Sequence, residues 1–176
     1  MNKQAKKDLY RYYGARGEDL LHRLFRPREL KYLICLRRAQ KSKNPLVHLR
    51  LRRLSAKTGI QIPARTNIGE GLYIGHTGRV IINPQAVIGR NVNLATGVTI
   101  GQENRGARKG CPTIGDEVWI GTNAVIVGNI RIGNDVLIAP LSFVNFDVPD
   151  HSIVIGNPAK VIARPYATEH YIDHKV

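Results

Sequence analysis

Aliphatic residues recur at every sixth position over most of the chain, and a small residue often follows them. The recurrence forms three runs, with a two-residue shift after the first and a polar, glycine-rich interruption at 101–113 after the second. The recurring positions are Ile62, Ile68, Ile74 and Val80, then Ile82, Ile88, Leu94 and Ile100, then Ile114, Ile120, Ile126, Ile132, Ile138 and Val144. A period of six fits neither an amphipathic helix nor the alternation of a long strand. It predicts a solenoid of short strands joined by tight turns, in which each coil buries its aliphatic side chains against its neighbours.

The first 58 residues show helical spacing instead. Val47, Leu51 and Leu54 recur at intervals of four and three residues, with basic residues between them. Pro45 is placed to begin a helix and Gly59 to end one. We therefore expect three parts: short basic helices over residues 1–58, a solenoid over 59–162 and a tail or short helix over 163–176.

Positive charge is concentrated in the helical part. Residues 1–60 carry 17 Lys and Arg against 4 Asp and Glu, whereas residues 61–176 carry 10 against 9. The excess fits a solvated helix face, and it also fits a peripheral contact with an anionic membrane, which attracts basic residues by about 1 kcal/mol each. A basic patch without a recognition motif is weak evidence for nucleic-acid binding, so no nucleic acid is expected as a partner.

Patterns for export, membrane insertion and metal binding are missing from the sequence. The N-terminus has no apolar stretch of the kind found in signal peptides, and no apolar run approaches the roughly 20 residues of a membrane span. The two cysteines, Cys35 and Cys111, exclude a disulfide framework, and neither lies at zinc-finger spacing from a histidine. We expect a cytoplasmic protein without a metal. The basic helices also allow a position at the inner face of the membrane.

The six-residue pattern resembles that of the hexapeptide-repeat acyltransferases, and residues 156–162 resemble the motif that closes their last coil. More narrowly, residues 68–76, 86–88 and 111–115 resemble the serine acetyltransferase branch. The resemblance covers about residues 59–162. It implies a mainly β fold, a left-handed parallel β-helix of triangular cross-section, preceded here by the small basic helical segment. It also implies a homotrimer with active sites between subunits. Contacts between the N-terminal helices could join two such trimers into a hexamer.

The resemblance further implies acetyl transfer from acetyl-CoA to a hydroxyl group. Such a transfer needs a base for the hydroxyl proton, donors for the oxyanion and a groove for the long CoA arm. Histidine suits the base role because its ordinary pKa lies near neutrality. His76 is the one histidine within the repeats and matches the catalytic histidine of the branch, so we expect the general base there rather than a plain surface histidine.

Donor-binding residues are implied by the same resemblance. Gly101, Gln102, Thr122 and Asn123 match positions near the pantetheine arm. Lys160 matches a basic position near the CoA phosphates, for which a point charge is suited. These five residues are therefore expected to bind acetyl-CoA.

Three positions depart from the serine acetyltransferase pattern. Gln61 stands where the branch has the Asp that orients the catalytic histidine. Gly75 replaces an Asp that helps to hold the amino-acid substrate, and Cys111 replaces a loop histidine that contacts its carboxylate. An amide at Gln61 can accept a hydrogen bond from His76, but it cannot stabilise an imidazolium as a carboxylate does. Gln61, Cys111 and the turn residue Asn83 are expected on the acceptor side of the site.

These departures favour an acceptor other than L-serine. We expect an O-acetyltransferase that acetylates a sugar hydroxyl in surface polysaccharide biosynthesis, as some relatives within the branch do. One alternative is a serine O-acetyltransferase of cysteine biosynthesis, and an alternative of another class is a non-catalytic β-helix scaffold. The γ-type carbonic anhydrases share the fold but need three histidines around zinc, and the repeats contain one.

Overall fold

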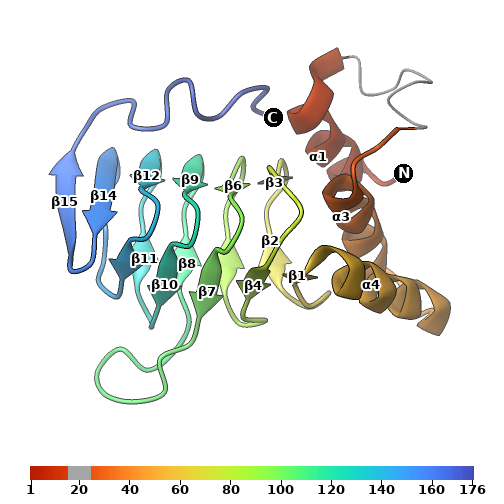
Figure 1. Ribbon diagram of the computed structural model, residues 1–176, viewed down its shortest axis with the longest axis horizontal. Coiled ribbons are helices and arrows are strands. Elements are labelled where there is room, and N and C mark those ends of the chain that lie inside the picture. The colour runs from red at the N-terminus through yellow and green to blue at the C-terminus, as the bar shows by residue number, and fades with distance from the viewer. Residues whose placement is uncertain (16–24) are drawn as a thin grey trace.

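The computed structural model describes residues 1–15 and 25–176, so residues 16–24 of the predicted helical segment lie outside it. Three helices cover one end of a parallel solenoid, and the C-terminal tail returns along the solenoid towards the first helix (Figure 1). The predicted fold class is confirmed: the protein is a left-handed parallel β-helix of hexapeptide repeats preceded by a small basic helical segment.

The described helices are α1 (Lys3–Tyr13), α3 (Arg28–Ala39) and α4 (Pro45–Thr58). Short polar signals begin and end them. The side chains of Asn2 and Asn44 cap α1 and α4 by accepting hydrogen bonds of 2.8 and 2.9 Å from first-turn N–H groups. Pro45 occupies the first turn of α4, where an N–H has no helical partner. Gly59 ends α4 in the left-handed conformation, with φ of 77°.

In the described part of the chain, fifteen strands form the three faces of the solenoid. Sheet A contains β1 (Ile60–Gln61), β4 (Val80–Ile82), β7 (Thr99–Gly101), β10 (Val125–Val127) and β13 (Phe143–Val144). Sheet B contains β2 (Asn67–Ile68), β5 (Val87–Ile88), β8 (Thr113–Ile114) and β11 (Arg131–Ile132). Sheet C contains β3 (Tyr73–Ile74), β6 (Asn93–Leu94), β9 (Val118–Ile120), β12 (Val136–Ile138), β14 (Ser152–Gly156) and β15 (Ala159–Ala163).

Strands of neighbouring coils pair in parallel. In the regular part a coil takes 18 residues, so Thr113 pairs with Arg131 and Val118 with Val136. The interruption between β7 and β8 forms a loop that projects from the side of the solenoid (Figure 1). The final pair, β14 and β15, is antiparallel and closes the solenoid with a hairpin.

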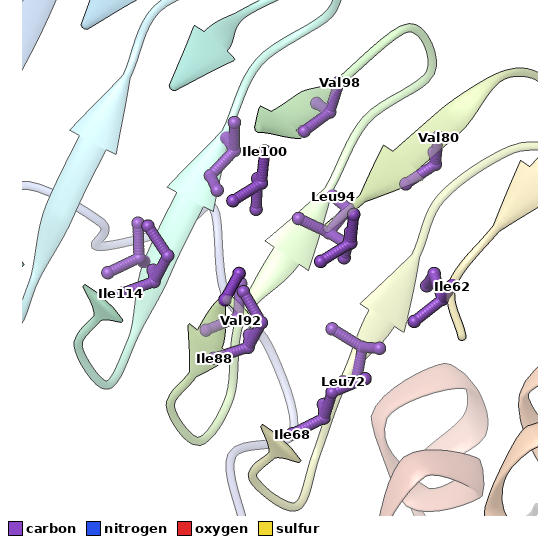
Figure 2. Close-up of a cluster of buried hydrophobic side chains, with 14 of the residues drawn as sticks. Ile62, Ile68, Leu72, Val80, Ile88, Val92, Leu94, Val98, Ile100 and Ile114 are labelled. Carbon is purple, nitrogen blue, oxygen red and sulfur yellow. The ribbon is translucent and has the colours of Figure 1, made fainter. Parts of the chain in front are cut away.

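The recurring aliphatic side chains form the core, as the six-residue pattern predicted. All of them are buried, with no more than 4% of any residue exposed. Ile68, Ile88 and Ile114 come from successive coils of sheet B and stack on one another inside the solenoid (Figure 2). Each layer contacts only the layers beside it, so the core is a column whose length follows the number of coils.

The turns after sheet B are packed backbone against backbone. A Cβ placed on Gly89 would lie 2.3 Å from the carbonyl oxygen of Gly115 in the next coil. The small residue that follows the inward aliphatic is therefore a requirement of coil spacing at this corner.

Residues 164–176 form neither a helix nor a strand, and they run back over the solenoid towards α1 (Figure 1). The carboxylate of Asp135 accepts hydrogen bonds from the backbone N–H and the hydroxyl of Thr168, at 2.9 and 2.7 Å. Closer to α1, the Asn93 side chain donates a hydrogen bond to the carbonyl of Tyr171 at 2.9 Å. The tail is thus fixed to several coils in turn.

Candidate active site

His76 lies in the turn between β3 and β4, on the edge where the chain passes from sheet C to sheet A, here called the C–A edge. Its side chain is exposed and has no hydrogen bond or ion pair within the part of the chain that the structure describes. It lines a cavity of about 170 Å³, here called the His76 cavity. The other lining residues come from three successive coils and are Tyr73, Gly75, Asn93, Leu94, Ala95 and Trp119.

A second cavity, of about 270 Å³, shares Tyr73, Asn93 and Trp119 with the His76 cavity. We call it the Arg11 cavity. It lies between sheet C, α1 and the returning tail, and its remaining lining residues are Arg11, Tyr12, Tyr171, Asp173 and His174. The His76 cavity therefore shares three lining residues with a larger cavity that has aromatic walls and is lined by charges of both signs.

Arg11 is fixed in place by the first coils of the solenoid. Only 4% of the residue is exposed. Its Nε donates to the carbonyl of Gly71 at 3.1 Å, its Nη2 donates to the side chain of Asn93, and its guanidinium lies 5.8 Å from the ring centre of Tyr73. Burial lowers the pKa of Arg11, while the negative charge of Asp173 acts in the opposite direction.

Tyr12 fixes α1 against the strand that precedes His76. Its hydroxyl donates to the carbonyl of Ile74 at 2.8 Å and accepts from the N–H of the same residue at 3.1 Å. Its ring also packs against Tyr73, with centres 4.5 Å apart. Burial raises the pKa of Tyr12 well above its usual value, so the hydroxyl stays neutral and keeps both hydrogen bonds.

The residues predicted to bind acetyl-CoA lie at three places. Thr122 and Asn123 share the C–A edge with His76, two coils further on, which is roughly 10 Å at about 4.8 Å per coil. Gly101 ends β7 and Gln102 begins the projecting loop, where its side chain donates to Asn104 at 2.6 Å.

Lys160 is exposed on β15, at the closing hairpin. Only Thr122 and Asn123 are therefore on the same edge as His76.

The residues predicted on the acceptor side lie on another edge, where the chain passes from sheet A to sheet B, here called the A–B edge. Gln61 ends β1 and lines a groove against α4, and no contact links it to His76. Asn83 accepts a hydrogen bond from the N–H of Gln85 at 2.9 Å, which stabilises its own turn. Cys111 lies 3.8 Å from the side-chain oxygen of Gln85, and burial raises the pKa of its thiol. Within one chain, none of the three reaches His76.

Sequence reasoning missed the Arg11 cavity, because α1 and the tail are brought together only by the return of the chain. One signal was available on sheet C. Tyr73, Asn93 and Trp119 are register partners on successive coils, each one residue before an inward aliphatic, so their side chains share the outer face. Trp119 lines both cavities and packs edge-on against Tyr171.

Residues 1–15 and 25–176 show neither a metal-binding cluster nor a membrane-spanning helix. This part of the chain contains no group of three or more His, Cys, Asp or Glu side chains that could hold a metal ion. None of the helices described in it is both long enough and apolar enough to cross a membrane.

The coiled hexapeptides with a histidine on one edge define a hexapeptide solenoid of the transferase type. The family described as bacterial transferase hexapeptide (six repeats) matches residues 111–145. The serine acetyltransferase of Neisseria gonorrhoeae in complex with serine is 30% identical with a TM-score of 0.74, over 92% of this chain and 68% of that one. The soybean serine acetyltransferase apoenzyme is 31% identical with a TM-score of 0.76, over 90% of this chain and 67% of that one. The chain therefore belongs to the hexapeptide-repeat acyltransferase family.

Curated sequences show the same relationship over a shorter span. Serine acetyltransferase 2 of Arabidopsis thaliana is 42% identical over 110 residues, which are 62% of this chain and 34% of that protein. The chain spans between about a third and a half of the length of the curated relatives it matches.

The predicted sugar acceptor of surface polysaccharide biosynthesis is wrong. The relatives and solved structures named above are serine acetyltransferases, and one of those structures is a complex with serine. The prediction rested on Gln61, Gly75 and Cys111. Within one chain, Gln61 and Cys111 lie on the A–B edge, away from His76, so their side chains do not line the His76 cavity. Gly75 does line that space, and its missing side chain leaves room there.

Proposed function

We propose that this chain transfers an acetyl group from acetyl-CoA to the hydroxyl of L-serine, with His76 as the general base. The observation that carries the proposal is the place of His76: an exposed imidazole without a hydrogen-bond partner among the described residues, in a cavity on the edge of a solenoid that is similar to serine acetyltransferases. An imidazole in this state has both ring nitrogens available for a hydroxyl proton.

The reaction needs one proton to be moved twice. A ring nitrogen of His76 removes the proton of the serine hydroxyl while the hydroxyl oxygen attacks the thioester carbonyl of acetyl-CoA. The tetrahedral intermediate then collapses with cleavage of the carbon–sulfur bond, and the imidazolium returns the proton to the departing CoA sulfur. The products are O-acetylserine and CoA, and the imidazole is regenerated neutral. Backbone N–H groups along the C–A edge are candidates for holding the oxyanion.

The C–A edge also suits the long arm of the donor. Its turns begin with small residues on four successive coils, which are Gly75, Ala95, Gly121 and Ala139. Their small size lets a ligand approach the backbone closely. Thr122 and Asn123 lie along this path from His76, and the closing hairpin with Lys160 lies at its far end. Gly101 and Gln102 belong to the projecting loop and would join the donor site only across a subunit boundary.

A homotrimer is part of the proposal, and it would give Gln61, Asn83 and Cys111 a place. These residues lie on the A–B edge with the projecting loop, so a neighbouring copy could bring its A–B edge to the C–A edge of the first. Closed cyclic symmetry is the usual arrangement of homo-oligomers. Light scattering on the purified chain tests it, and a monomer that retains full activity would contradict it.

A peripheral contact with an anionic lipid surface is proposed for the helices, and a cytoplasmic location stays a prediction. Lys31, Arg38 and Arg50 converge on a groove of about 220 Å³ between α3 and α4. Apolar side chains form the rest of its lining, and 70% of Leu46 is exposed there. No ion pair to a described residue neutralises any of the three cations. Unpaired cations beside exposed apolar groups complement phospholipid head groups and acyl chains.

The test of the catalytic proposal is release of CoA from acetyl-CoA with and without L-serine, with the acetylated product identified by mass. The His76→Ala variant should lose about 10²–10⁴-fold in turnover, the usual contribution of a general base. His170→Ala is the matched control, because His170 is exposed on the tail and lines neither cavity. Failure of the wild-type chain to acetylate L-serine would refute the proposal and favour a non-catalytic scaffold.

A further inference from the structure

Recognition of an amino acid requires a cation for its carboxylate and an anion for its ammonium group. On the C–A edge, Gly75 offers no side chain for either task. Cys111 is on a different edge, and burial raises the pKa of its thiol, so it is uncharged at neutral pH. If L-serine is the acceptor, the charged groups that this chain itself supplies must come from elsewhere.

Arg11 is the cation best placed for the carboxylate. Its guanidinium is held by Gly71 and Asn93, and 4% of the residue is exposed, so it is already oriented before a ligand arrives. Its planar fork matches a carboxylate. Asn93 belongs to both cavities, so the guanidinium is fixed at the boundary between its own cavity and that of His76.

Asp173 supplies the opposite charge. It lies on the returning tail, its side chain is exposed, and it lines the Arg11 cavity. The two charges are near enough to influence each other, yet no ion pair joins them. One cavity therefore presents a cation and an anion that are not neutralised by direct contact, which complements a zwitterion.

Three shared residues link the two ends of the proposed site. Tyr73, Asn93 and Trp119 line both cavities, and His76 lies in the turn that follows β3. The aromatic rings of Tyr12, Tyr73 and Trp119 form walls of the Arg11 cavity.

We propose that Arg11 and Asp173 form the amino-acid subsite of the acceptor: Arg11 binds its carboxylate, Asp173 binds its ammonium group, and its hydroxyl faces His76. This inference rests on the proposed function of the chain as a serine O-acetyltransferase. It assigns the polar recognition to α1 and the tail, which are elements outside the repeats.

Steady-state kinetics with three acceptors tests the subsite. L-serine has both charges, 2-aminoethanol lacks the carboxylate, and 3-hydroxypropionate lacks the ammonium group. Arg11→Met should raise the KM for L-serine by about tenfold or more, the size of one lost charge-assisted hydrogen bond, and leave 2-aminoethanol unaffected. Asp173→Asn should raise the KM for L-serine and leave the KM for 3-hydroxypropionate unchanged. The KM for acetyl-CoA should not change in either variant.

Arg79→Met is the matched control, because Arg79 is an exposed cation in the turn of His76 that lines neither cavity. A structural role of Arg11 would lower activity with all three acceptors equally, and that result would overturn the subsite. Should Arg11→Met fail to fold, Asp173→Asn still tests the subsite, because Asp173 is exposed. Unchanged discrimination among the three acceptors in Asp173→Asn would also overturn the subsite. Absence of serine acetylation in the wild type would instead reject the underlying function.

Discussion

Arg37 and Asp8 form an ion pair in which both side chains are fully buried, with Nε to Oδ2 at 2.7 Å and Nη2 to Oδ1 at 3.1 Å. The pair joins α3 to α1 and also covers the open end of the solenoid. Arg37 donates to the carbonyls of Ile68 and Gly69, and Asp8 accepts from the N–H of Leu72 at 3.0 Å. These backbone groups belong to the first coil, which has no preceding coil to pair with them, and buried backbone groups need partners.

Replacement of Asp8 by Ala should therefore destabilise the protein strongly. It leaves the Arg37 guanidinium buried without a counter-charge, for which a loss of about 3–5 kcal/mol in the free energy of unfolding is expected. Urea denaturation measures it. The control is Arg90→Ala, which breaks an exposed pair with Asp116 and should change stability little. Equal effects of the two variants would show that the buried pair does not stabilise the helical cap.

Two glycines that look alike in the sequence should respond differently to alanine. Gly89→Ala places a Cβ 2.3 Å from a backbone oxygen of the next coil, so the coils must separate, at a cost of about 1–3 kcal/mol. Gly75→Ala meets nothing closer than a ring carbon of Tyr73 at 3.5 Å, which is ordinary contact. Thermal unfolding of both variants separates them. A Gly89→Ala variant as stable as Gly75→Ala would mean that this corner can relax.

The fold could be predicted from the sequence because its core is local. An inward aliphatic every six residues needs only its neighbours one coil away, so the repeat shows both the strand positions and the buried face. The end of the solenoid could not be predicted in this way. Arg37 continues an amphipathic helix pattern and looks like a solvated cation, and its burial depends on Asp8, which is 29 positions earlier in the sequence.

The candidate site could likewise be predicted only where its residues belong to the repeats. His76 was predicted because it lies within repeats whose register is known and matches the catalytic histidine of the resembled branch. Arg11 and Asp173 carry no such register, since one lies on a helix before the repeats and the other on a tail after them. Arg11 and Asp173 line the same cavity because the tail returns over sheet C, and no periodic pattern in the sequence predicts that return. Gln61 and Cys111 were assigned to the site by position in the resemblance, although their edge is not the edge of His76 in one chain.

The attachment of the tail should depend on pH through Asp135. Burial raises the pKa of this carboxyl, but hydrogen bonds from His151, Thr168 and Ala167 outweigh it, and the net pKa lies below the ordinary 3.8. A lowered pKa means that the stabilisation is complete above the ordinary value and is lost as the pH falls through the lowered one. We expect hydrogen exchange at the Thr168 amide to become faster than in the rest of the fold below about pH 4.

Asp135→Asn should show that faster exchange already at neutral pH, by about tenfold, because the charge that strengthens these hydrogen bonds is gone. Asp147→Asn is the control, since Asp147 is exposed and accepts a single backbone hydrogen bond from Arg131 at 2.7 Å. Slow exchange at Thr168 in the Asp135 variant would show that the tail is held by its other contacts alone.

The groove between α3 and α4 predicts selective binding to anionic vesicles. The full chain should pellet with vesicles of phosphatidylcholine and phosphatidylglycerol and stay in solution with phosphatidylcholine alone. Reversal of Lys31, Arg38 and Arg50 to Glu should weaken binding by about a hundredfold or more, given about 1 kcal/mol for each basic residue near the surface. Leu46→Ser should weaken it as well, because the exposed leucine adds apolar contact that charge alone does not supply.

The same change of charge at another place is the control for vesicle binding. Arg105, Arg108 and Lys109 are exposed on the projecting loop, and reversing them to Glu alters the net charge by the same amount. If the attraction came from net charge alone, both triple variants would lose binding equally, and Leu46→Ser would have no effect. That result would overturn the proposed contact, whereas loss confined to the groove variants would place the lipid surface against α3 and α4, where cations without an ion pair to a described residue surround an apolar groove.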